Sequence, residues 1–206
     1  MKTMMNETGK KQADSKYRVR RLKEGEKIES FDCGDADLND FILNTAPLYL
    51  EELLAITYIM EERETGKVVA FYSLATDKVS INEFESKTEF NRFRKQRFTN
   101  AKRLKSYPAI KLCRIGVDLS ARGMHLGTRI LNMVKMKCRY NKTFGCRFLT
   151  VDAYIDKLPF YKKNEFNEMT DADKGDVHTR VLIYDLKKVA EVIPLPPPAT
   201  GEVQIV

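Results

Sequence analysis

The sequence predicts an α/β fold of the α+β kind, a single domain in which helices flank a central twisted mixed sheet of about six to seven strands. Three observations predict it. Short β-rich runs recur along the chain, and segments whose apolar residues have helical spacing lie between them. The third is that the 206 residues are 43% hydrophobic and 32% charged, as in a globular protein with one well-buried core.

The first predicted elements are a strand and a helix. Residues 17–22 alternate in polarity as a strand does, and residues 37–45 have the apolar spacing of a helix. Asp35 or Asp37 caps this helix, because a short carboxylate accepts hydrogen bonds from the free N–H groups of the first turn.

Two β-rich runs follow, over 53–60 and 68–76. The polar turn Glu-Arg-Glu-Thr-Gly separates them, which predicts an antiparallel pair. A basic insertion over about 83–107 comes next, with a helix near 88–97. Because the insertion lies between two strands of the core, we expect its role to be peripheral to chemistry in the core.

The second half of the chain supplies the remaining strands and the longest helix. In order, these elements are a strand over 110–117, a helix from 126 to about 140, a strand over 147–151, a short helix over 156–163, and closing strands over 165–169 and 179–186. The domain thus spans 17–190, between a disordered polar arm over 1–16 and a proline-rich tail or docking arm over 191–206.

Several classes of protein are disfavoured. No apolar run approaches the length of a membrane span, and the N-terminus lacks the apolar stretch of a signal peptide, so we expect a cytoplasmic protein without membrane contact. The four cysteines have no paired spacing, and no Cys or His lies in a ligand-like pair. Buried reduced thiols are therefore favoured over a metal site at Cys33, Cys113, Cys138 and Cys146.

The junction between the strand over 110–117 and the next helix has the features of a phosphate site. Free N–H groups and the positive end of the helix dipole converge at a helix N-terminus. Gly123 and Gly127 allow close approach of the backbone to a ligand, and Arg122 adds a full positive charge. The ligand that suits this junction is a pyrophosphate.

Two motifs resemble the GNAT superfamily of N-acetyltransferases. The superfamily's acetyl-CoA loop is Arg or Gln, two residues, Gly, one residue, then Gly or Ala, and it matches Arg122, His125 and Gly127, with His125 replacing the first glycine. Downstream, residues 160–166 resemble the superfamily's Phe-Tyr-x-x-x-Gly-Phe segment, with Glu165 replacing the glycine.

A third match resembles the GNAT branch that contains the aminoacyl-tRNA-acetylating toxins of toxin–antitoxin systems. Residues 31–41 resemble an upstream segment of that branch. The branch also tends to have Pro followed by Leu-x-Arg-Leu-x-Val-Asp, matched here by Pro108, Leu112, Arg114, Ile115, Val117 and Asp118. Together the matches span roughly 31–184.

The resemblance implies direct transfer of acetyl from the cosubstrate acetyl-CoA to a primary amine. Central parallel strands would splay, freeing the N–H groups of Ile115, Gly116 and Val117 for the acetyl carbonyl and pantetheine. Tyr161 would be the general acid, because a phenol titrates near pH 10 and stays protonated at rest. The remaining cofactor-binding residues that it implies are Arg122, Gly123, Met124, His125, Leu126, Gly127, Thr128 and Phe160.

Each assignment has a simpler structural alternative. Tyr161 could be a rim tyrosine with a packed ring, and Gly116 could mark only a bulge or close backbone approach. For His125 we favour loop packing over a proton shuttle. His178 lies in a polar loop, where solvation is favoured over ligation. Tyr154 stands where many members of the superfamily have an asparagine that contacts the cofactor.

The general base stays unassigned. Asp77, Asp118 and Asp152 lie at strand ends that could face a cleft, and Asp118 is better explained as a turn or cap residue. A chain of water molecules could serve equally well.

The net charge of +7 is concentrated in the insertion. The basic residues are Arg92, Arg94, Lys95, Arg97, Lys102, Arg103 and Lys105, interleaved with Phe90, Phe93 and Phe98. The segment over 92–105 could bind tRNA or another polyanion. The alternative, slightly favoured, is a solvated amphipathic helix whose phenylalanines pack on the body.

The acceptor amine remains open between aminoacyl-tRNA, a protein amine and a small molecule. The basic insertion and the branch motifs favour tRNA, with an antitoxin and a second copy of the chain as further candidate partners. The hypothesis from another class is a catalytically idle acyl-CoA-binding module, which the replaced glycines favour and Tyr161 disfavours.

Overall fold

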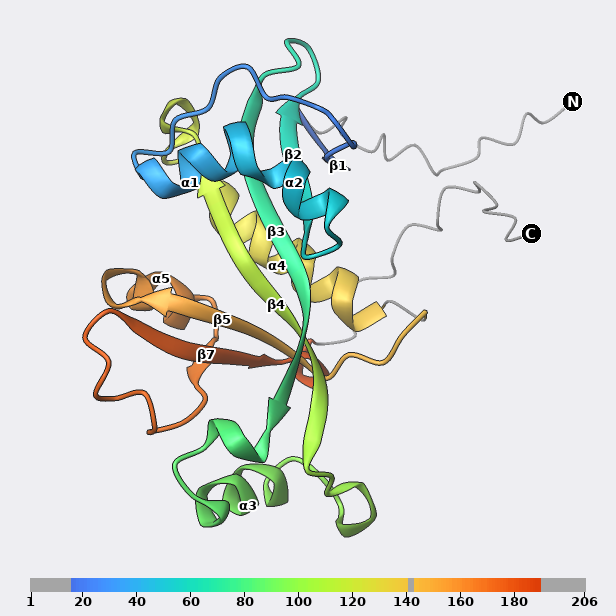
Figure 1. Cartoon of the computed structure of the whole chain (residues 1–206), viewed down its shortest axis with the longest axis vertical. Coiled ribbons are helices and arrows are strands. Elements are labelled where there is room, and N and C mark those ends of the chain that lie inside the picture. The colour runs from blue at the N-terminus through green and yellow to red at the C-terminus, as the bar shows by residue number, and fades with distance from the viewer. Residues whose placement is uncertain (1–15, 141–142, 190–206) are drawn as a thin grey trace, which may run out of the picture.

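Seven strands form one mixed sheet in the order β1-β2-β3-β4-β5-β7-β6, in a computed structural model that describes residues 16–140 and 143–189 (Figure 1). The strands are β1 (Tyr17–Arg21), β2 (Ile56–Glu62), β3 (Val68–Ser80), β4 (Ser106–Val117), β5 (Phe148–Tyr154), β6 (Asn167–Glu168) and β7 (Thr179–Asp185). Neighbouring strands are antiparallel except β4 and β5, which are parallel. The predicted mixed sheet is confirmed. The predicted arm over 1–16 and tail over 191–206 lie outside the described residues, apart from Lys16.

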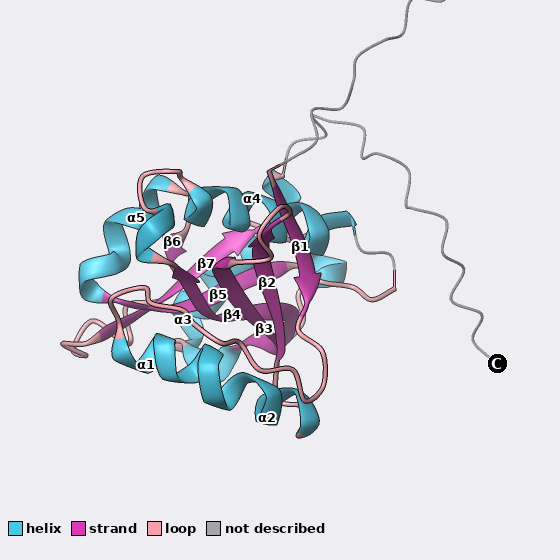
Figure 2. Cartoon of the chain, turned by 90° about the horizontal axis from the view of Figure 1, so that it is seen from above, coloured by secondary structure: helices cyan, strands magenta, loops and turns pink. Residues whose placement is uncertain are grey.

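Helices cover both faces of this sheet. They are α1 (Ala36–Asp40), α2 (Ala46–Glu51), α3 (Lys87–Lys95), α4 (Leu126–Tyr140) and α5 (Leu158–Lys163). Figure 2 shows α1 and α2 on one face and α4 and α5 on the other, and Figure 1 places α3 at the far end of β3 and β4. None of the described helices combines the length and the apolar composition that crossing a bilayer requires.

Several predicted boundaries are wrong: β3 runs past 76 to Ser80, β4 begins before 110 at Ser106, and β5 runs past 151 to Tyr154. The helix expected over 37–45 continues through a π-helical turn into α2. Pro47 does not end it, because proline in a first helical turn removes only an N–H that has no partner there. The strand expected over 53–60 begins at Ile56, since Leu53 adopts a positive φ of 56° in the preceding turn.

The core has one apolar layer under α4 and another under α1. Ile130, Leu131 and Val134 recur with helical spacing and are fully buried against the sheet. On the opposite face Phe71 is fully buried, with its ring centroid 5.3 Å from Phe31. These two layers hold the central strands in place.

The basic insertion packs on the body through its phenylalanines. Phe90 and Phe93 of α3 are buried in a cluster that includes Tyr107 and Phe148, and the Phe98 ring stacks on Tyr107 with centroids 4.0 Å apart. Ser86 caps α3 by accepting the Glu89 N–H. The expected packing of the phenylalanines is therefore confirmed.

Candidate active site

The parallel strands β4 and β5 separate in the middle of the sheet. They pair only over 109–111 and 148–150, although β4 continues to Val117 and β5 to Tyr154. Beyond Lys111, no described strand pairs with the β5-facing side of β4. The expected splay of the central parallel strands is confirmed.

Two backbone amides of β4 are directed into this gap. The Asp118 N–H donates to Val69 of β3 at 2.9 Å, and strand groups alternate in direction. The N–H of Gly116 therefore points toward β3, whereas those of Ile115 and Val117 point toward the gap. Of the three amides expected to face a ligand, the geometry offers two, and Gly116 has a different role.

Gly116 is required by packing. A Cβ placed there would lie 2.6 Å from Cε1 of Phe71, the opposite residue on β3. The register also shifts nearby, leaving Cys113 as an extra residue in β4, which is a β-bulge. The bulge therefore lies at Cys113 and not at Gly116, which pairs regularly with Phe71, and the close approach at Gly116 is that of the Phe71 ring.

A cavity of about 370 Å³ passes through the gap. The predicted site residues that line it are Ile115, Val117, Arg122, Gly123, His125, Leu126, Gly127, Phe160 and Tyr161. Gly116, Met124 and Thr128 do not line it. Met124 instead accepts a hydrogen bond at Sδ from the Tyr17 hydroxyl, at 3.0 Å.

Asp118 shapes the loop that precedes α4. It accepts hydrogen bonds from the Ser120 N–H at 3.0 Å and the Asp32 N–H at 3.1 Å. Burial opposes its ionisation, but the bonds from the Ser120 hydroxyl and these two N–H groups outweigh burial and lower the pKa of Asp118 to about 2. Asp118 is thus a cap residue, as expected, and its oxygens are committed to the loop.

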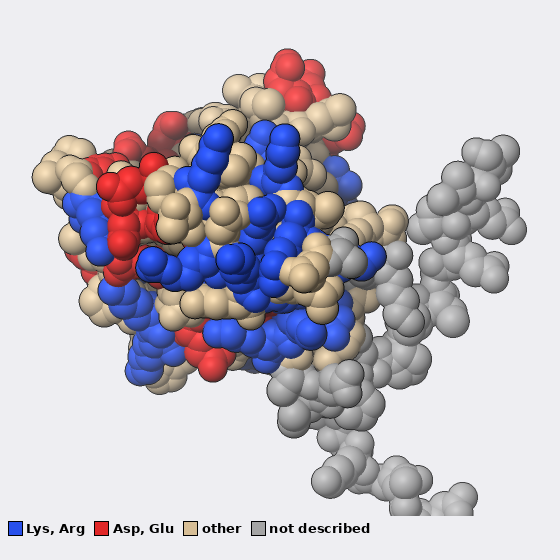
Figure 3. All heavy atoms as spheres, turned by 90° about the horizontal axis from the view of Figure 1, so that it is seen from below, with Lys and Arg blue, Asp and Glu red and all other residues tan. Residues whose placement is uncertain are grey.

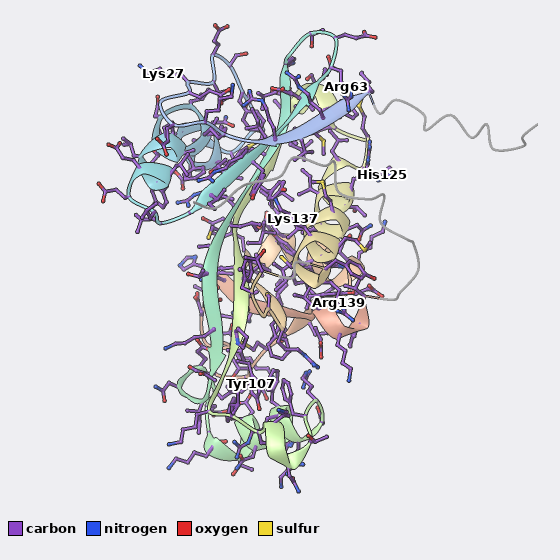
Figure 4. The ribbon with its side chains drawn as sticks, turned by 90° about the vertical axis from the view of Figure 1, so that its right-hand side faces the viewer. Lys27, Arg63, Tyr107, His125, Lys137 and Arg139 are labelled. Carbon is purple, nitrogen blue, oxygen red and sulfur yellow. The ribbon has the colours of Figure 1, made fainter. Side chains whose placement is uncertain are left out.

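Two non-glycine residues occupy left-handed backbone conformations at the positions where the GNAT motifs have glycine. His125 has a φ of 54° and Glu165 a φ of 64°. This conformation costs an L-residue with a side chain about 1–2 kcal/mol. The packing role expected for His125 is wrong, because its side chain is exposed at the start of α4 (Figure 4). At both positions the backbone has a conformation that glycine adopts more readily than other residues.

Arg122 and Gly127 join the loop to neighbouring elements. The Arg122 guanidinium donates to the Cys33 carbonyl at 3.0 Å, which ties the loop to the segment before α1. A Cβ on Gly127 would lie 3.1 Å from Cζ of Phe160, so the glycine lets the first turn of α4 approach α5. The loop therefore lies against both walls of the cavity.

Tyr161 is buried in α5, with 6% of its surface exposed. Its ring packs edge-on against Phe160 and Phe166, with centroids 5.1 and 5.6 Å away. Burial raises the pKa of Tyr161 to about 12, so the phenol remains protonated in neutral solution. A protonated phenol at the wall of the cavity has the state that a proton donor needs.

Lys135 is a structural residue that the sequence interpretation missed. Its ammonium donates to the Asn164 carbonyl at 2.6 Å, at the end of the helix that carries Tyr161. Burial lowers the pKa of Lys135. The signal was its position on α4, directly after Val134 and four residues after Leu131, where an exposed lysine would not lie.

The remaining polar residues considered for the site differ in their hydrogen-bond partners and exposure. Asp77 accepts a hydrogen bond from the Thr150 hydroxyl at 2.5 Å, and Asp152 pairs with Lys111 at 2.5 Å. His178 is exposed in a loop, and Tyr154 lines the cavity with 52% of its surface exposed.

The cysteines are free, and only Cys138 is buried, so the expected burial of the thiols is wrong for the half-buried Cys33, Cys113 and Cys146. Within residues 16–140 and 143–189, no three His, Cys, Asp or Glu side chains are grouped to hold a metal ion.

Comparison with known proteins gives structural matches over most of the chain. No protein-family model matches the sequence. A tyrosine-to-phenylalanine mutant of KacT is 19% identical with a TM-score of 0.67, covering 84% of this chain and 96% of that one. AtaT complexed with acetyl-methionyl-tRNAfMet is 20% identical with a TM-score of 0.63, covering 83% and 95%. A tyrosine-to-phenylalanine mutant of the AtaT toxin, bound to acetyl-CoA and the C-terminus of the antitoxin AtaR, is 18% identical with a TM-score of 0.62, covering 83% and 94%.

Proposed function

The chain has the GNAT fold of KacT and AtaT, and from that premise we propose that it is an acetyl-CoA-dependent N-acetyltransferase acting on a primary amine. One observation carries the proposal. Two unpaired amides of β4, the loop before α4 and the buried phenol of Tyr161 all line the same cavity. This set can hold a thioester, its phosphates and its departing sulfur together.

The loop supports binding of the cofactor's pyrophosphate. Free N–H groups of the first turn of α4 and the positive end of its dipole attract phosphate oxygens. Gly123 has a φ of 79° and His125 follows with a φ of 54°, and such turns direct N–H groups into one concave site. Arg122 adds a cation on the cavity wall.

The gap supports the transfer step. The amides of Ile115 and Val117 can bind the acetyl oxygen, on which negative charge develops as the amine nitrogen attacks the carbonyl carbon. The carbon–sulfur bond then breaks, and Tyr161 gives its proton to the departing thiolate. The substrate ammonium loses two protons in total, of which one replaces the proton of Tyr161 and the other reaches solvent.

We expect calorimetry to detect acetyl-CoA binding by the full chain, with Arg122→Glu weakening it about 10- to 100-fold. The substitution removes a charge-assisted contact to phosphate and puts a like charge beside it. Arg129→Glu is the control, because Arg129 is an exposed arginine of α4, the helix that follows the loop, and does not line the cavity. Absence of binding at millimolar acetyl-CoA would contradict both the enzyme and the idle acyl-CoA-binding alternative.

For the acceptor, we propose the amino group of an aminoacyl-tRNA. A structure of AtaT complexed with acetyl-methionyl-tRNAfMet supports this class for a protein of the same fold. Lysine and arginine side chains also gather on the face at the α3 end (Figure 3). Arg94 and Arg97 are engaged internally, donating to backbone carbonyls at 3.1 and 3.0 Å. Within the segment over 92–105, the exposed cations are Arg92, Lys95, Lys102 and Lys105.

We expect acetylation of total aminoacyl-tRNA to fall steeply with salt, and the triple charge reversal of Lys95, Lys102 and Lys105 to glutamate to flatten that dependence. Each lost phosphate contact lowers the logarithmic salt slope by about 0.7–0.9, so three lower it by about 2–3. The measurement is radiolabelled acetyl transfer across a salt series.

The matched control for this charge reversal is Lys16, Lys23 and Lys27 to glutamate, three exposed lysines far from the insertion. Figure 4 shows Lys27 and Tyr107 at opposite ends of the molecule. Cell-extract protein, polyamines and aminoglycosides are offered in parallel as acceptors. Label that enters only the small amines, with no salt dependence, would reject the tRNA acceptor.

An antitoxin partner follows from the same comparison as a proposal. AtaT has been solved bound to the C-terminus of the antitoxin AtaR. An adjacent reading frame whose product copurifies with this chain and suppresses transfer would support a toxin–antitoxin pair.

A further inference from the structure

Asp152 lies where two cavities meet. It lines the cavity that passes through the gap between β4 and β5, and it also lines a second cavity of about 390 Å³. The second cavity lies between the C-terminal part of β3 and the segment after β6. Glu89 of α3 fixes that segment by accepting the Asp171 N–H at 2.9 Å. Asp152 is therefore a residue that both cavities share.

The side chain of Asp152 is on the face of the sheet that α1 covers. Along β5, Val151 and Ala153 are buried in the cluster under α4, so the alternating Thr150 and Asp152 belong to the other face. Lys111 pairs with Thr150 in the last register pair before the strands separate. The ion pair of Lys111 and Asp152 thus crosses the point where the gap opens.

The second cavity carries an excess of negative charge. Its lining includes two lysines, Lys78 and Lys111, and four carboxylates, Asp77, Glu83, Asp152 and Asp173. Oδ1 of Asp173 is buried without a hydrogen-bond partner in the described structure, while Oδ2 accepts the Val181 N–H at 2.6 Å. A cationic group fits these surroundings better than a neutral or anionic one.

The three carboxylates that the sequence offers at strand ends differ in how much of the side chain is available to a ligand. Asp118 is 6% exposed and committed to its loop, and Asp77 accepts the Thr150 hydroxyl. Asp152 keeps 45% of its side chain exposed, and Lys111 contacts it through Oδ2. Lys111 does not enclose the carboxylate, which leaves Asp152 accessible to a second partner.

We infer that Asp152 binds the ammonium group of the acceptor, and that the second cavity is the route by which the acceptor reaches the acetyl carbonyl. This inference rests on the proposed acetyltransferase function. The carboxylate holds the nitrogen at the mouth of the gap, next to the amides of Ile115 and Val117. When the ammonium gives up its first proton to solvent, its lone pair can attack the carbonyl carbon.

The experiment compares the parent protein with Asp152→Asn and Asp156→Asn. Radiolabelled acetyl transfer is measured with total aminoacyl-tRNA and with a panel of polyamines and aminoglycosides. We expect Asp152→Asn to raise the KM for the acceptor about 10- to 100-fold, because a charge-assisted contact is lost, and to leave the Kd for acetyl-CoA unchanged. Asp156 is the matched control, since it also pairs with a lysine at 2.5 Å and lines neither cavity.

A pH series separates binding from a structural role. The KM of Asp152→Asn divided by the KM of the parent should decrease as the pH rises above the pKa of the acceptor, which is about 8 for an α-amino group. A neutral amine has no charge for Asp152 to bind. A ratio that is constant with pH, or an unchanged KM in a variant of an active parent, overturns the inference alone. A parent protein that labels no acceptor overturns the proposed function and the inference together.

Discussion

Tyr161→Phe is expected to lower the rate of acetyl transfer about 10²- to 10⁴-fold and to leave acetyl-CoA affinity unchanged. The ring and its contacts with Phe160 and Phe166 remain, and only the proton donor is lost. Turnover by radiolabelled transfer and affinity by calorimetry are measured on the same preparations. Because burial raises the pKa of Tyr161 to about 12, its ionisation should leave the parent rate unaffected between pH 6 and pH 10, a window that lies about two units or more below that pKa.

The control for this substitution is Tyr154→Phe. Tyr154 lines the same cavity but lies on β5 with 52% of its surface exposed, so loss of its hydroxyl removes no buried proton donor. We expect a change of less than about tenfold. Equal turnover by Tyr161→Phe and the parent would assign Tyr161 to packing alone.

Gly116→Ala is expected to lower the free energy of unfolding by about 1–3 kcal/mol, because the added Cβ overpacks the core. It would lie 2.6 Å from Cε1 of the fully buried Phe71, which is itself confined by Phe31 and Phe41. Chemical denaturation measures the effect.

A double variant tests the cause of that loss. Phe71→Leu removes the clashing ring edge, so the two substitutions together should cost less than the sum of their separate costs. Gly175→Ala is the matched control, since a Cβ there has no described atom within 4 Å and should change stability by less than about 0.5 kcal/mol. Strict additivity of Gly116→Ala and Phe71→Leu would reject the steric explanation.

Much of the fold could be predicted because periodicity depends on local sequence. The apolar spacing of Leu126, Ile130 and Val134 predicted α4, and the polar turn at 62–66 predicted the pairing of β2 with β3. The Phe-Tyr segment and the loop before α4 also lie on one cavity, as the resemblance to GNAT proteins implied. Local patterns and short motifs were therefore sufficient for the elements and for most of the cavity wall.

The rest depends on contacts between distant segments. The direction of the Gly116 amide follows from pairing with Phe71, and the commitment of Asp118 follows from the Asp32 N–H, 86 residues away in the chain. The sequence alone does not distinguish the surroundings of Asp77, Asp118 and Asp152. Only the arrangement of β3, β4 and β5 shows which of these carboxylates is available to a ligand. The positive φ of His125 and Glu165 could not be predicted either, because a non-glycine residue rarely adopts it and its identity does not indicate it.

Because β4 pairs with β5 over only three residues, the rest of β4 has unpaired backbone groups on that side, as an edge strand does, although β4 lies in the middle of the sheet. An ordinary edge exposes its unpaired amides at the rim, where another chain can add to it and begin aggregation. Here α1 and α2 cover one face and α4 and α5 the other, so an approaching strand would meet helices instead of open backbone (Figure 2). The sheet can thus keep unsatisfied hydrogen-bond donors available to a slender ligand without offering a template for self-association.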